Sequence, residues 1–255
     1  MAVTTINGLN VPADSETLWR YVDLWKLKSL LESRGLYFVR SDRFTDTWDS
    51  ALPHAWRTKM QREMCDRPDG GTYTQATWYE EREIPSNPIQ CWNHAEHENP
   101  RMWREYTSDA NSVVIRSDIG RLRRCLGDAS IDVMVGLVSY GFHDDLDDPE
   151  FVVSAWGDSP INAANPWYVP RFLKRVEYSH ETELRLALHV PKDDQPIDPG
   201  YNLVVGHDAI TTLVDSIRFH PDATLDFQSE VSTLLCDTGF QDVTLDPSQI
   251  ETVIG

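Results

Sequence analysis

The opening of the chain constrains the fold most, because its hydrophobic pattern changes period twice in quick succession. SETLWRYVD predicts a short strand around Trp19–Tyr21. DLWKLKSLLESRG (23–35) then carries leucines at helical spacing, with Asp23 as the expected N-cap and Gly35 as the expected stop. LYFV (36–39) predicts a return strand. A strand, a helix and a second strand in direct succession favour a mixed fold in which helices pack on a sheet.

The rest of the chain continues this alternation. Further helices are predicted at 53–65, 99–107, 118–127 and 223–240, and a helix followed by a strand at 204–221. Further strands are predicted at 112–117, at 131–142, across 176–190, and in a segment that ends near Trp92, while 40–50 is a polar loop and 66–71 a turn. No internal repeat or long linker interrupts the pattern. We therefore expect a single α+β domain over 1–255, with a mixed or antiparallel sheet and flanking helices.

The charge balance of the chain is strongly acidic. Its 255 residues carry a net charge of −18, and only five of the 23 basic residues are lysines. Two interpretations are open: an acidic binding partner, or a protein of a salt-loving organism. The second is favoured, because the acidic residues are spread along the chain. HDDLDDPE (143–150) is the one acidic run, and it lacks the spacing and the central glycine of a calcium-binding loop.

Several classes of protein lose support from absent patterns. No apolar run approaches the roughly 20 residues of a membrane span, and MAVTTINGLN lacks the features of a signal peptide, so we expect no membrane association. The four cysteines lie far apart, which predicts a reduced, cytoplasmic protein. The chain contains no GxGxxG, P-loop, HExxH or GxSxG motif. Dinucleotide-fold dehydrogenases, P-loop nucleotidases, zincins and α/β-hydrolases are therefore disfavoured.

One segment has the residue types of a metal site. In CWNHAEH, Cys91, His94 and His97 are spaced three apart, and on a helical turn they would meet on one face. Pro100 follows closely and a fourth ligand is not evident, so exposed loop histidines are the preferred interpretation. No metal is therefore predicted.

The segment VEYSHETELRLALHV (176–190) is the most informative part of the sequence. Glu181, Glu183 and Arg185 alternate with leucines, which predicts a strand with its charges on one face. Two carboxylates roughly 6.7 Å apart on such a face would repel by about 2.5 kcal/mol at a dielectric constant of 20. A solvated face on which Arg185 neutralises Glu183 would explain the pattern, and so would the wall of a catalytic site. His180, beside the glutamates, is a candidate base.

Four stretches resemble a known prokaryotic family. They are LWRYVDLWKLKSLLESRGLYFVRSDRFTDTWD, CWNHAEHENPRMWREYTSDANSVVIRS, LKRVEYSHETELRL and LVDSIRFHPDATLDF. Over about 18–235 the chain is similar to domain of unknown function 2971, some members of which are linked with abortive phage infection. In the polar loop FTDTWD, Thr45 and Thr47 replace the Asn and Pro of the family pattern. The resemblance implies a role in antiviral defence and specifies no activity.

A weaker resemblance implies a chemistry. The opening strand, helix and return strand are similar to those of ADP-ribosyltransferases, in which an Arg or His on the first strand faces a late strand carrying a Glu–x–Glu pair. On this resemblance, Arg20 and the pair Glu181/Glu183 are the catalytic residues, and NAD is a substrate rather than a tightly bound cofactor. NPRMWREYT loosely resembles a segment of the DNA-modifying branch, whereas the middle Ser/Thr–Ser motif cannot be placed.

The chemistry of NAD cleavage suits these residue types. Breaking the bond between nicotinamide and ribose passes through an oxocarbenium-like state, as glycoside hydrolysis does, and a fixed carboxylate stabilises such a state. An arginine opposite can hold the pyrophosphate. The candidate cofactor-binding residues are Arg20, Tyr21, Trp92, Trp103, Tyr106 and Arg185, although aromatic residues at this spacing are more often part of a core.

Two hypotheses of different class follow for the function. The first is a cytoplasmic NAD-using ADP-ribosyltransferase or NAD glycohydrolase, acting as a toxin-like defence effector on a nucleic-acid or protein acceptor. The second is a non-catalytic module that binds a nucleotide or a partner, in which Arg20, Glu183 and Arg185 form a buried polar network. A metal-dependent nuclease is a distant third, because the sequence shows no third acid in a suitable context. The oligomeric state stays open.

The acidic composition generates the first testable prediction. At molar salt the Debye length falls to about 3 Å, which screens the mutual repulsion of the carboxylates. The protein is expected to keep its fold in molar KCl and to loosen in dilute buffer. Thermal unfolding followed by circular dichroism checks this, and a melting temperature that falls steadily with added KCl would contradict it.

Overall fold

The computed structural model describes most of the chain. The residues described are 11–46, 48–52, 57–58, 60–67, 69–141, 170–188, 190 and 199–250. The acidic run 143–150 and most of the first part of the predicted helix 53–65 lie outside them.

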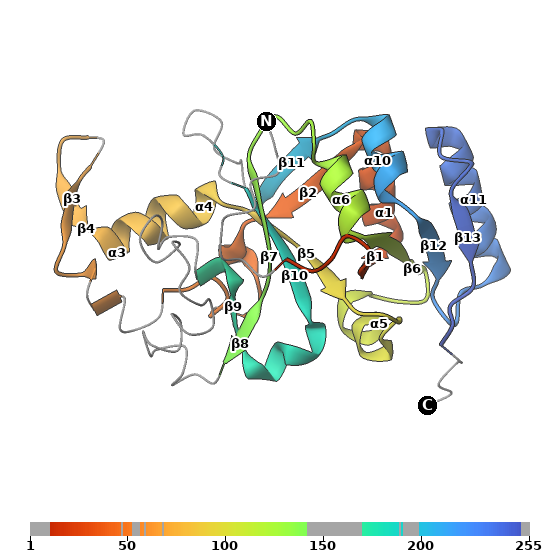
Figure 1. The fold of residues 1–255 in the computed structure, drawn as a ribbon, viewed down its shortest axis with the longest axis horizontal. Helices are drawn as coiled ribbons and strands as arrows, with labels where there is room; N and C mark the ends of the chain where they lie inside the picture. The colour runs from red at the N-terminus through yellow and green to blue at the C-terminus, as the bar shows by residue number, and fades with distance from the viewer. Residues whose placement is uncertain are drawn as a thin grey trace.

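A nine-stranded sheet, almost wholly antiparallel, forms the centre of the fold (Figure 1). From one edge it runs through β11 (Gly200–Val204), β2 (Gly35–Val39), β5 (Ile89–His94), β1 (Thr17–Asp23), β6 (Ser112–Asp118), β12 (Ser216–Phe219) and β13 (Thr244–Asp246). On the other side of β5 lie β10 (Glu183–Leu188) and then β7 (Val133–Leu137). In this sheet the pair β12–β13 is parallel, and the other described pairs are antiparallel. The expected α+β class with a mixed sheet and flanking helices is confirmed.

The helices pack on this sheet in two groups. The main core joins one sheet face to α1 (Leu24–Ser33), α6 (Ile119–Cys125), α10 (His207–Leu213) and α11 (Leu225–Thr238). On β1, Leu18 and Val22 belong to this core, whereas Trp19 and Tyr21 point to the opposite face, where α5 (Pro100–Tyr106) covers them. The two faces of β1 therefore meet two different helical layers.

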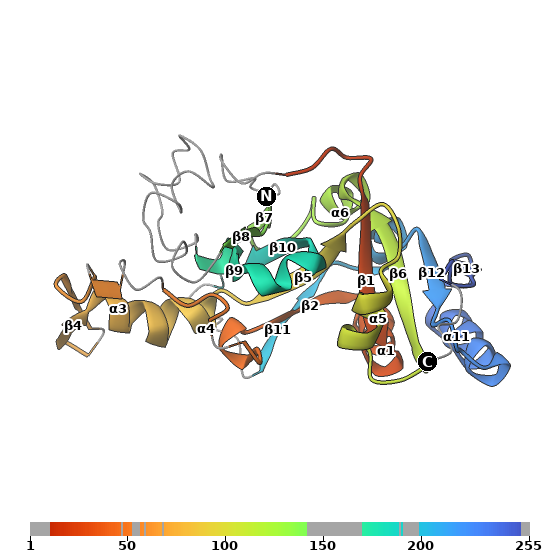
Figure 2. The ribbon, with the colours of Figure 1, turned by 90° about the horizontal axis from the view of Figure 1, so that it is seen from below.

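Smaller elements extend from the sheet. They are η1 (Ser41–Arg43), β3 (Met64–Asp66), β4 (Thr72–Thr74), α3 (Gln75–Trp78), the π-helical turn η2 (Tyr79–Glu83), α4 (Ile84–Ser86), β8 (Ser139–Gly141), β9 (Leu173–Arg175) and the 3-10 helix η4 (Val176–Glu181). Figures 1 and 2 both place the β3–β4 hairpin and α3 at the end of the molecule that lies away from α11 and β13. The sequence patterns did not predict the elements between 72 and 86, nor β11 and β13.

Two local predictions are wrong for tertiary reasons. Met64 and Cys65 were expected in a helix, but they pair with β4 across the turn at 66–71. Gly35 was expected to stop α1, but Arg34 ends it in a left-handed conformation at φ 52° and Gly35 begins β2. A Cβ at Gly35 would lie 2.7 Å from the Asn202 side chain, so the glycine serves the approach of β11.

The edge of β5 that faces β1 and β2 contains a gap. The register of β2 on this edge is Val39 opposite Ile89, and β1 joins it at Trp19 opposite Asn93. Between these points, residues 90–92 have no strand partner on this edge among the described residues. The two strands diverge because α1, which connects them, lies over the sheet. The gap leaves room for a cavity within the sheet.

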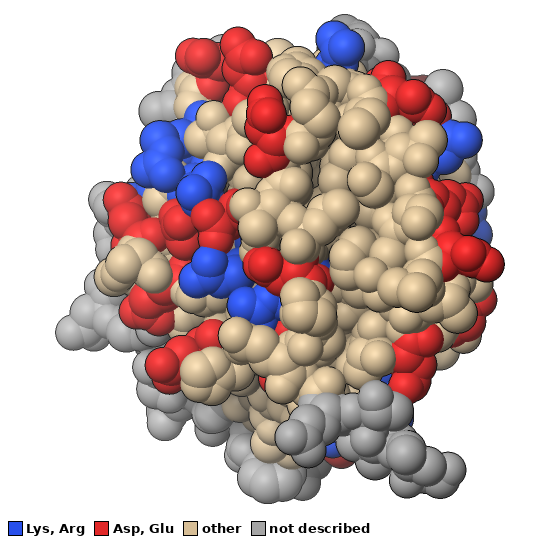
Figure 3. Space-filling model, turned by 90° about the vertical axis from the view of Figure 1, so that its right-hand side faces the viewer, with Lys and Arg blue, Asp and Glu red and all other residues tan. Residues whose placement is uncertain are grey.

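The surface charge agrees with the spread seen in the sequence. On the face shown in Figure 3, Asp and Glu side chains form several separate groups, and the basic side chains gather mainly on one side. On this face the acidic excess is therefore not concentrated in a single patch. The salt-loving interpretation stays a prediction.

Substitution of Gly200 tests how closely β11 has to approach β2 for the protein to be stable. A Cβ at this position would lie 2.2 Å from the Phe38 carbonyl oxygen, so Gly200→Ala forces the strands apart. We expect the free energy of unfolding in urea to fall by about 1–3 kcal/mol, as for other overpacked sites. Val204→Thr, a change of nearly equal volume at a 62% exposed position of the same strand, is the control. Equal stability of the Gly200→Ala variant and the wild type would show that the strands adjust freely.

Candidate active site

A cavity of about 680 Å³ occupies the gap in the sheet. Its walls come from α1 on one sheet face, from α5 and η4 on the other, and from β1, β2, β5 and β10. The loop after η1 also contributes, through Phe44, Thr45, Asp46 and Asp49. The volume lies in the range typical of small-molecule sites.

The cavity brings together most of the residues predicted from sequence. Those that line it are Arg20, Tyr21, Trp92, Tyr106, Glu181 and Glu183. Trp103 does not line it, because its ring packs edge-on against Tyr21 at 5.0 Å and its indole N–H donates to Glu98. Arg185 also lies outside the lining, fully buried behind Glu183. Trp103 and Arg185 therefore lie outside the lining of this cavity, and their contact with a ligand stays a prediction.

The two glutamates do not share a strand. Glu181 ends η4, and β10 begins at Glu183. Thr182 between them is left-handed, at φ 39°, which is uncommon for a β-branched residue. This break in the alternation directs both carboxylates toward one lysine. The alternating pattern predicted their proximity correctly but for the wrong local structure.

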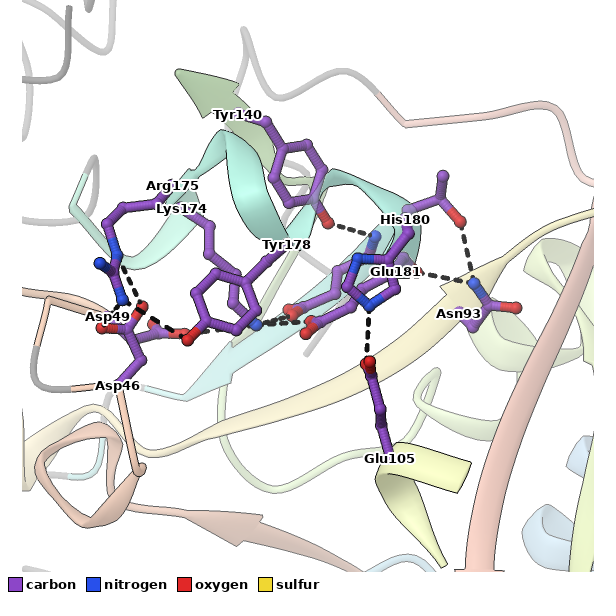
Figure 4. Close-up of polar contacts among 12 residues, drawn as sticks. Asp46, Asp49, Asn93, Glu105, Tyr140, Lys174, Arg175, Tyr178, His180 and Glu181 are labelled. Carbon is purple, nitrogen blue, oxygen red and sulfur yellow. Dashed lines mark hydrogen bonds and ion pairs between the residues drawn. The ribbon is translucent and has the colours of Figure 1, made fainter. Parts of the chain in front are cut away.

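Lys174 of β9 lies between the two glutamates (Figure 4). Its Nζ is 2.5 Å from Glu181 Oε2 and 2.6 Å from Glu183 Oε1. Arg185 Nε donates to Glu183 Oε2 at 2.6 Å, and the Arg185 guanidinium also binds both oxygens of Asp49, at 2.7 and 2.6 Å. We call these five residues the ion cluster. Each carboxylate in it meets at least one cation, as buried charges require.

The ion cluster is buried, which overturns the interpretation of a solvated sheet face. Glu181 is 2% exposed and Glu183 is 3% exposed, and every residue of β10 is buried. The pairing of Glu183 with Arg185 was nevertheless correct. Arg20, which was expected in the same network, has no carboxylate partner among the described residues. The network is completed by Asp49 and Lys174 instead.

The sequence contained little that could have pointed to the missing members of the ion cluster. Asp49, Asn93 and Lys174 each lie in one of the stretches that carry the family resemblance, and this was the available signal. Lys174 is separated from β10 by η4, and no spacing rule relates β9 to β10. Asn93 was missed as well, although its Nδ2 donates to the Glu181 carbonyl oxygen at 2.6 Å and fixes the backbone beside the cluster.

The two glutamates differ in their affinity for protons. Burial, followed by hydrogen bonding to Glu183 and the negative charge of Glu183, raises the pKa of Glu181 to about 8. Burial alone would also raise the pKa of Glu183, but the charges of Arg185 and Lys174 hold it well below its usual range. One carboxyl group thus carries a proton near neutral pH while its neighbour stays ionised.

Arg20 contributes a positive charge to the cavity wall opposite the two glutamates. Its guanidinium lies 5.8 Å from the centre of the Trp92 ring, and burial lowers its pKa to about 10, which leaves it charged at neutral pH. On β1 the side chain of Arg20 lies on the same sheet face as Leu18 and Val22. Glu183 lies on the opposite face, because it pairs with Asn93, which in turn pairs with Trp19. The cavity therefore has a cationic wall and a carboxylate wall on opposite sides of the gap.

The three residues with the spacing of metal ligands, for which no metal was predicted, do not come together. Cys91 and His94 lie on β5 rather than on a helix, and His94 Nε2 is 2.6 Å from Glu16 Oε2. A different group, Glu105, His180 and Glu181, has its ligand atoms within 4.8 Å of one another. His180 Nε2 already lies 2.7 Å from Glu105 Oε2, and Glu181 is held by Lys174, so these side chains satisfy one another. His180 thus orients Glu105 at the rim of the cavity.

The comparisons with known proteins leave the family open. No family model and no curated protein matches the chain. The resemblance to domain of unknown function 2971 therefore remains a prediction. No helix in the described part of the chain has the length and apolar character needed to cross a membrane.

Among solved structures, the chain is similar to DarT of Thermus sp. 2.9. The three complexes concerned contain ADP-ribosylated ssDNA, NAD+ and carba-NAD+, with TM-scores of 0.37, 0.38 and 0.38. Identity is 11% in each case, over 94% of this chain and 95%, 98% and 97% of the DarT chains. TM-scores of this size do not support a conclusion about function.

The raised pKa of Glu181 makes stability depend on pH. At pH values between 4.5, the ordinary pKa of a glutamate, and about 8, Glu181 of the folded protein holds a proton that the unfolded chain has released. This contribution to stability is complete below pH 4.5 and is lost as the pH rises through about 8, at up to about 1.4 kcal/mol per pH unit. Glu181→Gln, which is neutral throughout, is expected to gain stability relative to the wild type as pH rises.

Urea unfolding at several values between pH 5 and pH 9 measures this difference. Glu177→Gln, an exposed position on the same 3-10 helix, is the control and is expected to parallel the wild type. If the Glu181→Gln curve runs parallel as well, Glu181 is ionised throughout and the assignment of its proton is wrong.

Proposed function

We propose that the cavity binds NAD and cleaves the bond between nicotinamide and ribose, as an ADP-ribosyltransferase or an NAD glycohydrolase. The observation that carries the proposal is the charge separation across the gap. In the described part of the chain Arg20 is a cation without a carboxylate partner on one wall, and Glu181 and Glu183 lie on the other. Each wall suits a different part of one ligand.

NAD has the matching distribution of charge. Its pyrophosphate is anionic, and a guanidinium without a competing carboxylate binds phosphate oxygens in bidentate fashion. Its nicotinamide ring is cationic, and carboxylates favour such a ring. Tyr21, Trp92 and Tyr106 line the cavity, and Tyr106, the most exposed of the three, offers an aromatic ring to a planar ligand group. A ligand that extends through the gap places both of its charged parts beside complementary groups.

The bond cleavage follows from the same arrangement. As the bond between the ring nitrogen and the ribose breaks, nicotinamide leaves with the electron pair and becomes neutral, so its departure needs no proton. The ribose carbon gains positive charge, which the buried, ionised carboxylate of Glu183 stabilises. The acceptor hydroxyl or water then adds to this carbon and loses a proton. Glu181 receives this proton once the cationic ring has favoured its ionised form.

The net charge of the ion cluster depends on the protonation of Glu181. With Glu181 protonated, the anions Glu183 and Asp49 balance the cations Lys174 and Arg185. Ionisation of Glu181 makes the ion cluster negative by one charge, which favours the developing cation. NAD is then a substrate, and the acceptor is a nucleic acid or a protein. Such an activity in a cell would deplete NAD or modify an essential target, which suits a defence effector or toxin.

A second candidate function has an observation in its favour. Both oxygens of Glu183 are occupied, one by Lys174 and one by Arg185, as in a structural ion network. In that case the cavity binds a nucleotide or another ligand without turnover, and the protein acts as a sensor or a partner-binding module.

The experiment is incubation of the protein with NAD, alone and with nucleic-acid or protein acceptors, followed by chromatography of released nicotinamide. We expect release by the wild type. Glu183→Gln is expected to reduce the rate at least 100-fold, in line with removal of a preorganised electrostatic group. Arg20→Gln is expected mainly to raise KM, because the pyrophosphate loses its partner. Glu32→Gln, on α1 outside the cavity, is the control with unchanged activity.

The two candidates predict different results. A melting temperature raised by NAD without any nicotinamide release would favour the non-catalytic module. A Glu183→Gln variant that loses about 3–5 kcal/mol of stability, the usual cost of breaking a buried ion pair, yet keeps its ligand would make the residue structural.

A further inference from the structure

Trp25 is an unusual residue on the first helix. Its side chain is 66% exposed, although large aromatic side chains are normally buried. The buried residues of α1 are Leu27, Leu30 and Leu31, so the main core does not need Trp25. Trp25 nevertheless lines the cavity. Its exposure is therefore at a ligand site rather than on an unrelated surface.

A face of α1 turns toward the cavity together with Trp25. Lys26, Ser29 and Leu30 also line it, and the spacing of four residues places Trp25 above Ser29 on the helix. Lys26 Nζ lies 5.3 Å from the centre of the Trp25 ring. Its ion-pair partner among the described residues is Asp23, at 4.0 Å, and this carboxylate competes weakly because the Lys26 side chain is 42% exposed. An aromatic plane, a cation and a hydroxyl group thus lie on one helix face.

This helix face lies on the same side of the sheet as Arg20. Leu18 and Val22, which flank Arg20 on β1, pack in the core that contains α1. The carboxylates of Glu181 and Glu183 belong to the opposite side of the gap, on η4 and β10. A dinucleotide that places its cationic ring at the carboxylates and its phosphates at Arg20 therefore directs its second half toward α1.

We propose that the face of α1 formed by Trp25, Lys26 and Ser29 binds the adenosine half of the dinucleotide. This inference rests on the proposed use of NAD and assigns its second subsite. The Trp25 indole stacks on the adenine, the Lys26 ammonium joins Arg20 at the phosphates, and the Ser29 hydroxyl bonds to the adenosine ribose. Stacking on an aromatic ring tolerates partial exposure, because the base itself covers the ring when bound.

The test compares two fragments of the dinucleotide by isothermal titration calorimetry. ADP-ribose contains the adenosine half, and nicotinamide mononucleotide lacks it. Trp25→Ala is expected to weaken binding of ADP-ribose about 10-fold, within the range measured for loss of a stacked base. Binding of nicotinamide mononucleotide is expected to change less than about 2-fold. Trp25→Phe keeps an aromatic ring and is expected to restore most of the affinity for ADP-ribose.

Trp48→Ala is the matched control. Trp48 is another exposed tryptophan, at 46%, but it does not line the cavity, so its loss is expected to leave both affinities unchanged. Circular dichroism of each variant verifies that the fold is intact.

The inference fails on any of three outcomes: the wild type does not bind ADP-ribose, Trp25→Ala binds it as tightly as the wild type, or both fragments weaken equally. Nicotinamide release by the wild type is measured separately. Cleavage of NAD with ADP-ribose binding independent of Trp25 would leave the proposed function standing and remove this subsite alone. Binding that depends on Trp25 without cleavage would remove the catalysis and retain the subsite.

Discussion

The contact of one buried ammonium with two carboxylates is the interaction on which the rest of the site depends. Lys174 holds Glu181 and Glu183 within hydrogen-bonding distance of a single atom, and Arg185 balances the second oxygen of Glu183. Without these cations two buried carboxylates would not stay together, because both the loss of hydration and their mutual repulsion oppose it. The ion cluster also draws β9, η4 and β10 together with the loop that carries Asp49.

The ion cluster lies beside the gap in the sheet. Where β1 and β2 separate, residues 90–92 of β5 pair with β10 on one edge but have no strand partner among the described residues on the other, and the cavity uses this space. Side chains from both faces of the sheet therefore reach one volume, which a continuous sheet would prevent. That geometry lets Arg20, on the core face, and Glu183, on the other, line one cavity although they would not meet in a regular sheet.

The acidity of the whole molecule affects how such a ligand arrives. A net charge of −18 repels an anionic nucleotide at long range in dilute buffer. At high ionic strength the repulsion is screened beyond a few ångströms, whereas the contact that we propose between Arg20 and a phosphate inside the cavity would be screened much less. A surface of this kind and a cavity with its own cations are thus compatible in a saline environment.

The sequence by itself determined the elements with strong periodicity and the residue types of the site. The strand at Trp19–Tyr21, the first helix and the return strand follow from local patterns, and Glu181, Glu183 and Arg20 were chosen from the sequence as candidates. Local patterns suffice there because propensity and burial act along the same short stretch. The short strands β11 and β13 and the elements between 72 and 86 carried no such pattern.

Only the tertiary structure decided which charges meet. Lys174 and Asp49 come from elements remote from β10 in the chain, and Thr182 takes its left-handed conformation where Glu181 and Glu183 both turn toward Lys174. Burial then separates the proton affinities of the two glutamates, which no spacing in the sequence encodes, because desolvation depends on everything packed around a group. The same holds for Trp25, whose exposure acquires meaning only once the gap in the sheet is known.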